Sequence, residues 1–309
     1  MQQYTGRYSP KGVGRSVINN VKGAIFLIGD LHCHSKLSDS SAGLEDIVFY
    51  AKRAGLDFVA ITDHDTMAGV SRAVVLGKRY GVEVIPGAEI SCTDPNTGRR
   101  VHLLCYLPQK PNRLDSLFFR TLESRTQAGQ IMIKRVMQMY PVTEEHIARY
   151  YSSSKAIYKV HIMQALLDLG YDTAVYGPLY RQLFGDKTSP SYCGEPVNYP
   201  TVEEALNYIK IAKGVAVLAH PTVYQSMELL QTLAEQKLIH GVELYHPKNS
   251  AADQEKIRQI AEEYGLITTG GTDFHGYYAT GSSNPLATCI TGEESIAKLY
   301  QAAEKLESK

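Results

Sequence analysis

Histidines stand close to the ends of short apolar segments in this sequence, and their spacing suggests metal binding. His32 and His34 lie in GDLHCH, where the first apolar segment ends. Because side chains alternate along a strand, both imidazoles face the same way and Cys33 faces the other way. Two imidazoles on one face of a strand end are typical of a metal site.

Further imidazoles and carboxylates follow near later segments of the same kind. Asp39 lies in the loop KLSDSS, where capping of a helix or turn is the alternative role. TDHDT offers His64 as a ligand, with Asp63 as an acceptor that could fix the orientation of an imidazole. The other candidates are Glu89 in GAEIS, His102 in RVHLL, His220 in AHP, and Asp273 and His275 in GTDFHG.

These nine candidate ligands are too many for one metal ion. A carboxylate can bridge two ions, and with Glu89 shared the set would serve three ions, each with about three protein ligands and open positions for water or substrate. So many ionisable groups in one place would be costly without cations. The number of ligands therefore predicts three divalent ions. Because the ligands are nitrogen and oxygen without thiolate, Zn, Mn or Fe are the candidates.

The segments that end in these residues have the pattern of strands, and amphipathic helices separate most of them. The predicted strands are 24–30, 58–62, 82–90, 100–107, 215–220, 241–245 and 266–273. Strand–helix alternation predicts parallel βα units, and seven such strands favour a barrel over an open sheet. Reactive residues in these barrels gather at the C-terminal ends of the strands, so we expect the candidate ligands to meet there.

One long region interrupts this alternation. Residues 109–200 contain no strand pattern and are predicted to form helices followed by a loop rich in Pro, Gly and Tyr. We expect four parts in the chain, which are a basic N-terminal arm (1–24), a first part of the barrel (25–108), a helical insertion that caps the substrate site (109–200) and a second part of the barrel (201–309).

The order of these motifs resembles that of the polymerase and histidinol phosphatase (PHP) family of metal-dependent phosphoesterases. The motifs are H-x-H, TDHDT, GAEIS, a strand histidine, AHP and TDFHG. The resemblance runs from about residue 25 to the C-terminus and implies an α/β fold, a distorted (β/α)7 barrel, with a trinuclear metal site. It assigns His32, His34, Glu89 and Asp273 to the first metal, Glu89, His102 and His220 to the second, and Asp39, His64 and His275 to the third.

The insertion resembles that of the subgroup of AMP phosphatases, 3′,5′-nucleotide bisphosphatases and RNase AM, and Asp39 favours this subgroup because several other members have His there. The resemblance implies hydrolysis of a nucleotide phosphate ester by metal-activated water, with AMP, a nucleoside 3′,5′-bisphosphate or a short oligoribonucleotide as substrate. The alternatives are a histidinol-phosphate-type phosphatase, an amidohydrolase and a catalytically silent metal-binding domain.

Several residues are predicted to act on the substrate rather than on the metals. Arg125 and His161 match phosphate-contacting residues of the subgroup, and Lys187 matches a lysine common to it. Helix packing or solvent exposure is the alternative for each of these three. His246, after the sixth strand, is grouped with Asp63 as a candidate catalytic residue. Nine of the 21 tyrosines lie in 140–199, where a ring could stack on a nucleobase.

Composition excludes several other classes of protein. The chain has 32 Lys+Arg and 32 Asp+Glu, and zero net charge argues against binding to long nucleic acid or to an acidic membrane. No apolar run approaches the roughly 18 residues of a membrane span. The five scattered cysteines are typical of free thiols in a reducing compartment. We therefore expect a cytoplasmic monomer whose partner is its phosphate ester substrate.

Overall fold

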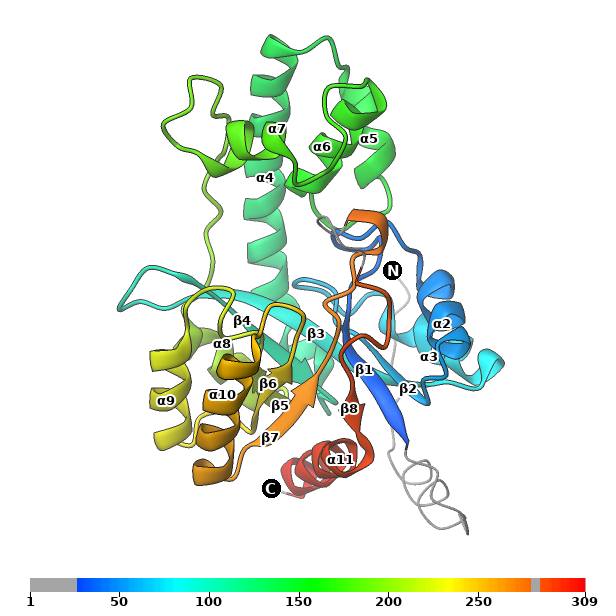
Figure 1. The fold of residues 1–309 in the computed structure, drawn as a ribbon, viewed down its shortest axis with the longest axis vertical. Coiled ribbons are helices and arrows are strands. Elements are labelled where there is room, and N and C mark those ends of the chain that lie inside the picture. The colour runs from blue at the N-terminus through cyan, green and yellow to red at the C-terminus, as the bar shows by residue number, and fades with distance from the viewer. Residues whose placement is uncertain (1–26, 279–283, 309) are drawn as a thin grey trace.

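Eight strands form one mixed sheet that curves into a nearly closed barrel in the computed structural model, which describes residues 27–278 and 284–308 (Figure 1). The strand order is β7-β6-β5-β4-β3-β2-β1-β8. The strands are β1 (Ile28–Cys33), β2 (Phe58–Ile61), β3 (Glu83–Thr93), β4 (Arg100–Tyr106), β5 (Val215–Leu218), β6 (Gly241–Tyr245), β7 (Ile267–Gly270) and β8 (Thr291–Gly292). The predicted α/β barrel is thus confirmed, and the predicted N-terminal arm lies outside the described residues.

Strand β4 runs against both of its neighbours. It pairs antiparallel with β3 and with β5, whereas β1, β2 and β3 are parallel to one another and so are β5, β6 and β7. His102, near the start of β4, pairs with Ser91, near the end of β3. The reversal therefore brings His102 to the end of the barrel where the parallel strands finish, which we call the mouth.

The barrel closes where the chain beyond β7 meets β1. The backbone N–H of His34 donates to the carbonyl of Phe274 at 2.9 Å, and the N–H of Phe274 donates to the carbonyl of His32 at 3.2 Å. A Cβ atom on Gly271 would lie 2.3 Å from the Cβ of His32, so only glycine allows the two segments to approach this closely. This contact carries the segment with Asp273 and His275 to the end of β1.

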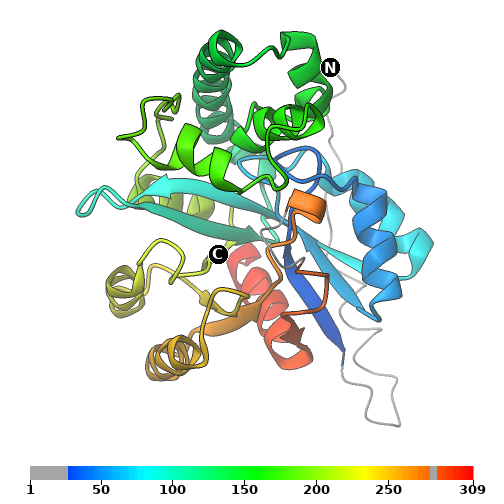
Figure 2. The same cartoon turned by 45° about the horizontal axis from the view of Figure 1, so that its top comes forward.

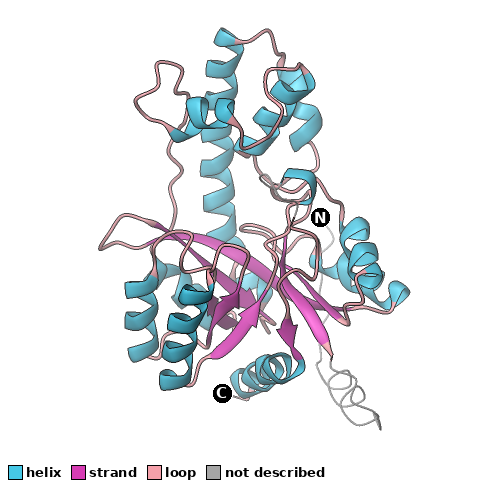
Figure 3. Ribbon diagram, viewed as in Figure 1, coloured by secondary structure: helices cyan, strands magenta, loops and turns pink. Residues whose placement is uncertain are grey.

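Helices cover the outside of the barrel (Figure 3). They are α2 (Leu44–Arg53), α3 (Val70–Tyr80), α8 (Val202–Ile211), α9 (Met227–Glu235), α10 (Ala251–Tyr264) and α11 (Glu293–Glu307). Apolar residues of α11, such as Leu299, pack with Leu31 and Ile85 of the barrel interior. Helix α11 therefore lies across the barrel end opposite the mouth.

The long connection from β4 to β5 contains the helices of the insertion. These are η1 (Pro111–Arg113), α4 (Asp115–Met139), α5 (Glu144–Tyr151), α6 (Lys159–Asp168), α7 (Pro178–Tyr180) and a π-helical turn, η2 (Arg181–Gly185). Leu117 and Phe118 of α4 join the barrel core, whereas Ile133 and Val136 join a separate apolar cluster with α5 and α6. Figures 1 and 2 both show the insertion beyond the mouth, on the side opposite α11.

Close packing fixes α6 against α4. A Cβ on Gly129 of α4 would lie 2.4 Å from the Cβ of Ile157, which lies two residues before α6 and belongs to the same apolar cluster. The boundaries predicted for the insertion fall within the region between β4 and β5, and the division into domains stays a prediction. Among the described residues, no helix combines the length and apolar character needed to cross a bilayer.

Candidate metal centre

Glu89, in the second half of β3, lies at the centre of a group of imidazoles. Its side chain is almost fully buried, with 1% exposed. One carboxylate oxygen, Oε1, lies 2.7 Å from Nδ1 of His102 and 2.8 Å from Nε2 of His220. The other oxygen, Oε2, lies 3.1–3.3 Å from a nitrogen of three further imidazoles, those of His32, His34 and His64. The two oxygens thus face two different groups of potential ligands.

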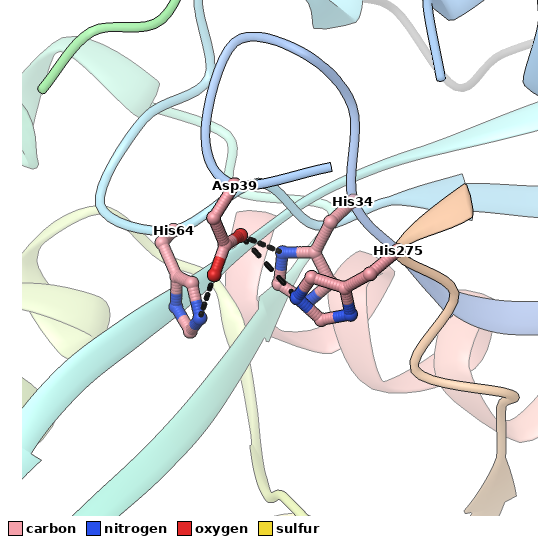
Figure 4. Close-up of side chains that lie close together, drawn as sticks. All are labelled: His34, Asp39, His64 and His275. Carbon is pink, nitrogen blue, oxygen red and sulfur yellow. Dashed lines mark ion pairs between the residues drawn. The ribbon is translucent and has the colours of Figure 1, made fainter. Parts of the chain in front are cut away.

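Asp39 forms a second focus next to this one (Figure 4). Its Oδ1 lies 3.3 Å from Nε2 of His275 and 3.7 Å from Nδ1 of His34. Its Oδ2 lies 3.7 Å from Nε2 of His64. The loop after β1 therefore directs a carboxylate toward imidazoles from three different segments of the chain.

Asp273, in the segment after β7, completes the arrangement. Its Oδ1 lies 3.4 Å from Nε2 of His32 and 3.2 Å from Nε2 of His34. Asp273 and His220 both have positive φ values, 52° and 21°. Left-handed backbone of this kind is sparsely populated outside glycine and is often found at functional sites. The structure therefore brings all nine predicted metal ligands together at the mouth.

The cluster has the properties of a site for cations. Several buried polar atoms have no hydrogen-bond partner, and they are Nε2 of His32, both ring nitrogens of His34, Nδ1 of His64, Nδ1 of His220 and Oδ1 of Asp39. Buried polar atoms are rarely left without a partner, so orphaned atoms that converge on one place indicate a missing ligand. Four groups of these side chains have ligand atoms within 4.8 Å of one another. The donor set therefore fits bound metal cations.

The charges of the cluster agree with this fit. Burial raises the pKa of Glu89, but His102 and His32 outweigh it and hold the pKa well below its usual range. Burial likewise raises the pKa of Asp39, but His275 and His64 outweigh it, so this pKa is also well below its usual range. Both carboxylates are thus ionised at neutral pH. Burial lowers the pKa of His34, yet Asp273 and Glu89 raise it to about 10, so a bound cation would displace a proton there.

Glu243 of β6 is a member of the site that the sequence did not reveal. It is fully buried, with Oε1 2.9 Å from Nδ1 of His32, and its Oε2 accepts a hydrogen bond from the backbone N–H of His220 at 2.8 Å. A carboxylate behind a ligating imidazole fixes the orientation of the ring and raises its basicity. The only available signal was an acidic residue in the apolar strand GVELY.

Asp63 does not have the environment expected of it. Its carboxylate accepts hydrogen bonds from the backbone N–H and the hydroxyl of Ser35, both at 2.7 Å, and from the hydroxyl of Ser38 at 2.6 Å. The hydrogen bonds of Asp63 thus go to serines, whereas the carboxylate that contacts the ring of His32 is Glu243, and the catalytic role of Asp63 stays a prediction. Asp63 instead holds the loop that carries Asp39.

His246 lies at the edge of the cluster. Its Nδ1 accepts a hydrogen bond from the backbone N–H of Lys248, so the ring proton is assigned to Nε2, which lies 3.5 Å from Oδ2 of Asp273. The ring centre is 5.1 Å from that of His220. This position is compatible with the predicted role near the reacting groups, which stays a prediction.

The predicted substrate residues lie in three different environments. Arg125 of α4 is buried, donates to Asp65 at 3.1 Å and to Ser91 at 3.0 Å, and has an Nε atom without a partner. His161 is also buried, and its Nδ1 accepts from the backbone N–H of Tyr158. Lys187 is exposed in the loop after η2. Their contacts with substrate stay predictions.

Aromatic rings enclose Arg125. Its guanidinium carbon lies 4.6 Å from the ring centre of Tyr158 and 5.4 Å from that of Tyr199. Such contacts stabilise a buried guanidinium. Arg125 is therefore held in one position between the insertion and the mouth.

A barrel with imidazoles and carboxylates gathered at its mouth is the architecture of a metal-dependent hydrolase. The sequence profile of the PHP domain matches residues 30–209, and the chain belongs to this family. The predicted family membership and the predicted class, a hydrolase of phosphoric esters, are confirmed.

Known proteins similar to this chain support both conclusions. It is 36% identical over 254 residues to phosphoribosyl 1,2-cyclic phosphate 1,2-diphosphodiesterase of Eggerthella lenta, covering 82% of this chain and 95% of that protein. It is 26% identical to 3′,5′-nucleoside bisphosphate phosphatase of Chromobacterium violaceum, covering 80% of this chain and 86% of that protein. A solved structure assigned as a metal-dependent phosphoesterase of Bifidobacterium adolescentis has a TM-score of 0.78 and 26% identity, covering 89% and 96% of the two chains.

Proposed function

We propose that this phosphoesterase hydrolyses a phosphate ester of a nucleotide or of another phosphoribosyl compound, with three divalent ions at the mouth of the barrel. The carrying observation is the central position of Glu89. Its two oxygens face two separate groups of imidazoles, as expected of a carboxylate shared between ions. Mn, Fe and Zn are the candidates for these ions.

Three groups of side chains would hold the ions. The first group is His32, His34, Glu89 and Asp273, the second is Glu89, His102 and His220, and the third is Asp39, His64 and His275. The ligand atoms of the first group lie within 4.8 Å of one another. Those of the third group do too, and His34 lies within the same distance of them. Bound divalent ions would supply Lewis-acid chemistry, which neutralises phosphate oxygens and lowers the pKa of water toward 7.

The chain's own residues would bind and orient the reactants. Glu243 holds the ring of His32, and Asp63 holds the loop of Asp39, so both carboxylates would position ligands. Arg125 would bind a phosphate oxygen through its free Nε, because a guanidinium donates to phosphate in a fixed geometry. His246 would donate a hydrogen bond from its Nε2–H near Asp273, at the edge where a leaving group could emerge.

Two relatives support a ribose phosphate as the substrate. The E. lenta relative acts on a phosphoribosyl cyclic phosphate, and the C. violaceum relative acts on a nucleoside bisphosphate. The higher identity to the first favours a cyclic phosphodiester, so we include it beside AMP, nucleoside 3′,5′-bisphosphates and short oligoribonucleotides. His161 and Lys187 remain proposed phosphate contacts of the insertion.

We also propose that the enzyme acts as a monomer in the cytoplasm. All five cysteines are free, and four of them are buried, which suits a reducing compartment. Light scattering on the purified chain would test the monomer, and a mass near 34.2 kDa is expected.

Phosphate release from a panel of esters tests the proposed function. The panel contains AMP, adenosine 3′,5′-bisphosphate, a dinucleotide, phosphoribosyl 1,2-cyclic phosphate and histidinol phosphate, each with added Mn²⁺. Opening of the cyclic ester releases no phosphate by itself, so a second phosphatase is added afterwards to that sample to reveal the opened product. We expect the ribose phosphates to be hydrolysed much faster than histidinol phosphate. Preference for histidinol phosphate would favour that rival, and bound metal without any turnover would favour a silent metal-binding domain.

A further inference from the structure

Arg100 lies at the rim of the mouth, beside the metal centre, and has no role in the site described so far. It opens β4 two residues before His102, so both side chains leave the same face of the strand. Its guanidinium carbon lies 5.6 Å from the ring centre of Tyr224 and 5.9 Å from that of Tyr199. The ring of Tyr224 is in turn 4.9 Å from that of His102. Two tyrosines thus hold an exposed arginine next to a proposed metal ligand.

Other cations face the same space between the rim and the insertion. Tyr199 contacts Arg125 as well as Arg100, so two guanidinium groups flank one ring. Lys159, at the start of α6, is half-buried with its Nζ 5.6 Å from the ring centre of Phe184. In the part of the chain that the structure describes, neither Arg100 nor Lys159 forms an ion pair with a carboxylate.

The positive charges are close enough to act on one another. Burial lowers the pKa of Lys159 to about 8, and the charges of Arg100, Arg125 and Lys187 contribute in the same direction. Cations that converge from β4, α4, α6 and the loop after η2 repel one another, and this repulsion is relieved when an anion binds between them. The local charge therefore indicates an anionic ligand.

We infer that Arg100, with Tyr199 and Tyr224 as its supports, forms a second anion subsite that holds a phosphate group of the substrate that is not hydrolysed, and that the charge of Lys159 strengthens it. The subsite rests on the proposed function, because its ligand is the same substrate. The Cα atoms of Arg100 and His102 are about 7 Å apart along the strand, a separation comparable to the size of one sugar unit. A guanidinium at this place binds a phosphate through two parallel hydrogen bonds.

The subsite makes the enzyme selective for substrates with two phosphate groups. The test compares kcat/KM for adenosine 3′,5′-bisphosphate with kcat/KM for AMP, using metal-loaded enzyme at fixed ionic strength. In Arg100→Gln we expect the ratio of the two values to fall about tenfold, the effect of one lost charge-assisted hydrogen-bond pair. The control is Arg99→Gln, the neighbouring exposed arginine, whose guanidinium donates to the backbone of Gln225. This variant should keep the ratio within about twofold of wild type.

An unchanged ratio in Arg100→Gln, or an equal fall in both variants, would overturn the subsite. Metal content of each variant, measured by elemental analysis, shows whether the neighbouring ligands are disturbed. If wild-type enzyme hydrolyses neither compound, calorimetric binding of adenosine 3′,5′-bisphosphate to the metal-loaded protein decides separately. Weaker binding in Arg100→Gln than in Arg99→Gln would keep the subsite although the proposed hydrolysis fails, and equal binding would reject both.

Discussion

Glu89 joins parts of the chain that lie far apart in sequence. Imidazoles from β1 and the residues after it, from the residues after β2 and β5, and from β4 all contact its carboxylate, although His32 and His220 are separated by 188 positions (220 − 32). A buried carboxylate among so many nitrogens is stabilised only when the surrounding charges balance. The residue thus links the local strand ends into one site.

Replacement of this carboxylate should empty the site. In Glu89→Gln we expect most of the bound metal to be lost and phosphoesterase activity to fall more than about 100-fold, because the proposed metal centre loses its central anionic ligand. The matched control is Glu83→Gln at the other end of β3, where the carboxylate accepts a hydrogen bond from Tyr300 instead. Elemental analysis of both proteins measures the effect, and a full metal complement in Glu89→Gln would contradict the assignment.

His161 should make stability depend on pH. Burial lowers its pKa to about 4, although Asp39 and the backbone of Ser38 act in the opposite direction. The ordinary pKa of about 6.5 applies to the unfolded chain, so the unfolded state binds the extra proton between pH 4 and 6.5. The stability of the neutral ring is present above about pH 6.5 and is lost as pH falls toward 4, by about 3 kcal/mol at most.

Denaturant unfolding between pH 4.5 and 7.5 checks this dependence on metal-free protein. We expect His161→Gln to lose less unfolding free energy than wild type as pH falls. His146→Gln, at a partly exposed histidine of α5, serves as the control and should follow wild type. The same slope in wild type and His161→Gln would reject the assignment.

The sequence predicted the site residues well where strand alternation decides the direction of a side chain. Alternation predicted that His64 and Asp63 face opposite ways, and His64 lies at the cluster whereas Asp63 contacts the serines of the loop after β1. The partners of Asp63 could not be predicted, because Ser35 and Ser38 come close only when the loop after β1 folds back. Glu243 was missed because its neighbours are apolar, so nothing local distinguishes a buried functional acid in a strand from a surface residue.

At the scale of the elements, α4 connects the metal centre to the insertion. Its first turns pack in the barrel core and its later turns pack in the separate cluster of the insertion, with Arg125 between the two. The helix thus places a guanidinium above the mouth through two independent sets of apolar contacts.

Arg125→Ala should weaken substrate binding and leave the metal in place. We expect KM to rise about 10- to 100-fold, since a charge-assisted contact is lost, while metal content stays at the wild-type level. Unfolding free energy should also fall, because Asp65 is left buried without its partner. Arg120→Ala, on the exposed side of the same helix in an ion pair with Glu204, is the control and should change neither quantity much. Equal metal loss and KM change in both variants would undo the role of Arg125.

The elements themselves could be predicted from sequence, but one direction could not. Each of the seven predicted strands overlaps an observed strand, because buried strands between helices have a strong apolar pattern. The same pattern gives no information on whether a strand runs with or against its neighbours. The position of His102 at the start of RVHLL, rather than at its end, was the one sign that β4 is reversed.

At the scale of the whole molecule, the ions should act as part of the folded structure. The cluster gathers orphaned ring nitrogens and ionised carboxylates in the interior, and cations would neutralise the carboxylates only in the folded state. Ligands that bind only the native state raise its stability by mass action.

Removal of metal should therefore lower thermal stability. Chelation followed by dialysis is expected to lower Tm by at least about 5 °C, and Mn²⁺ should restore it. Glu89→Gln should show little response to either treatment, whereas Glu83→Gln should respond like wild type. Equal Tm values for the chelated and Mn²⁺-loaded wild type would show that the ions do not stabilise the fold.

The reversal of β4 has a consequence for how the molecule can diversify. The chain leaves β4 at the end of the barrel opposite the mouth, beside the start of β5. It must therefore run back along the barrel before it can cover the mouth. The 25 residues of α4 span this distance, because a helix of that number of residues is roughly 37 Å long at 1.5 Å per residue. The helix is a stem on which caps of other sizes could be exchanged without moving a single metal-facing side chain. Reaction chemistry and reactant choice can thus be inherited separately.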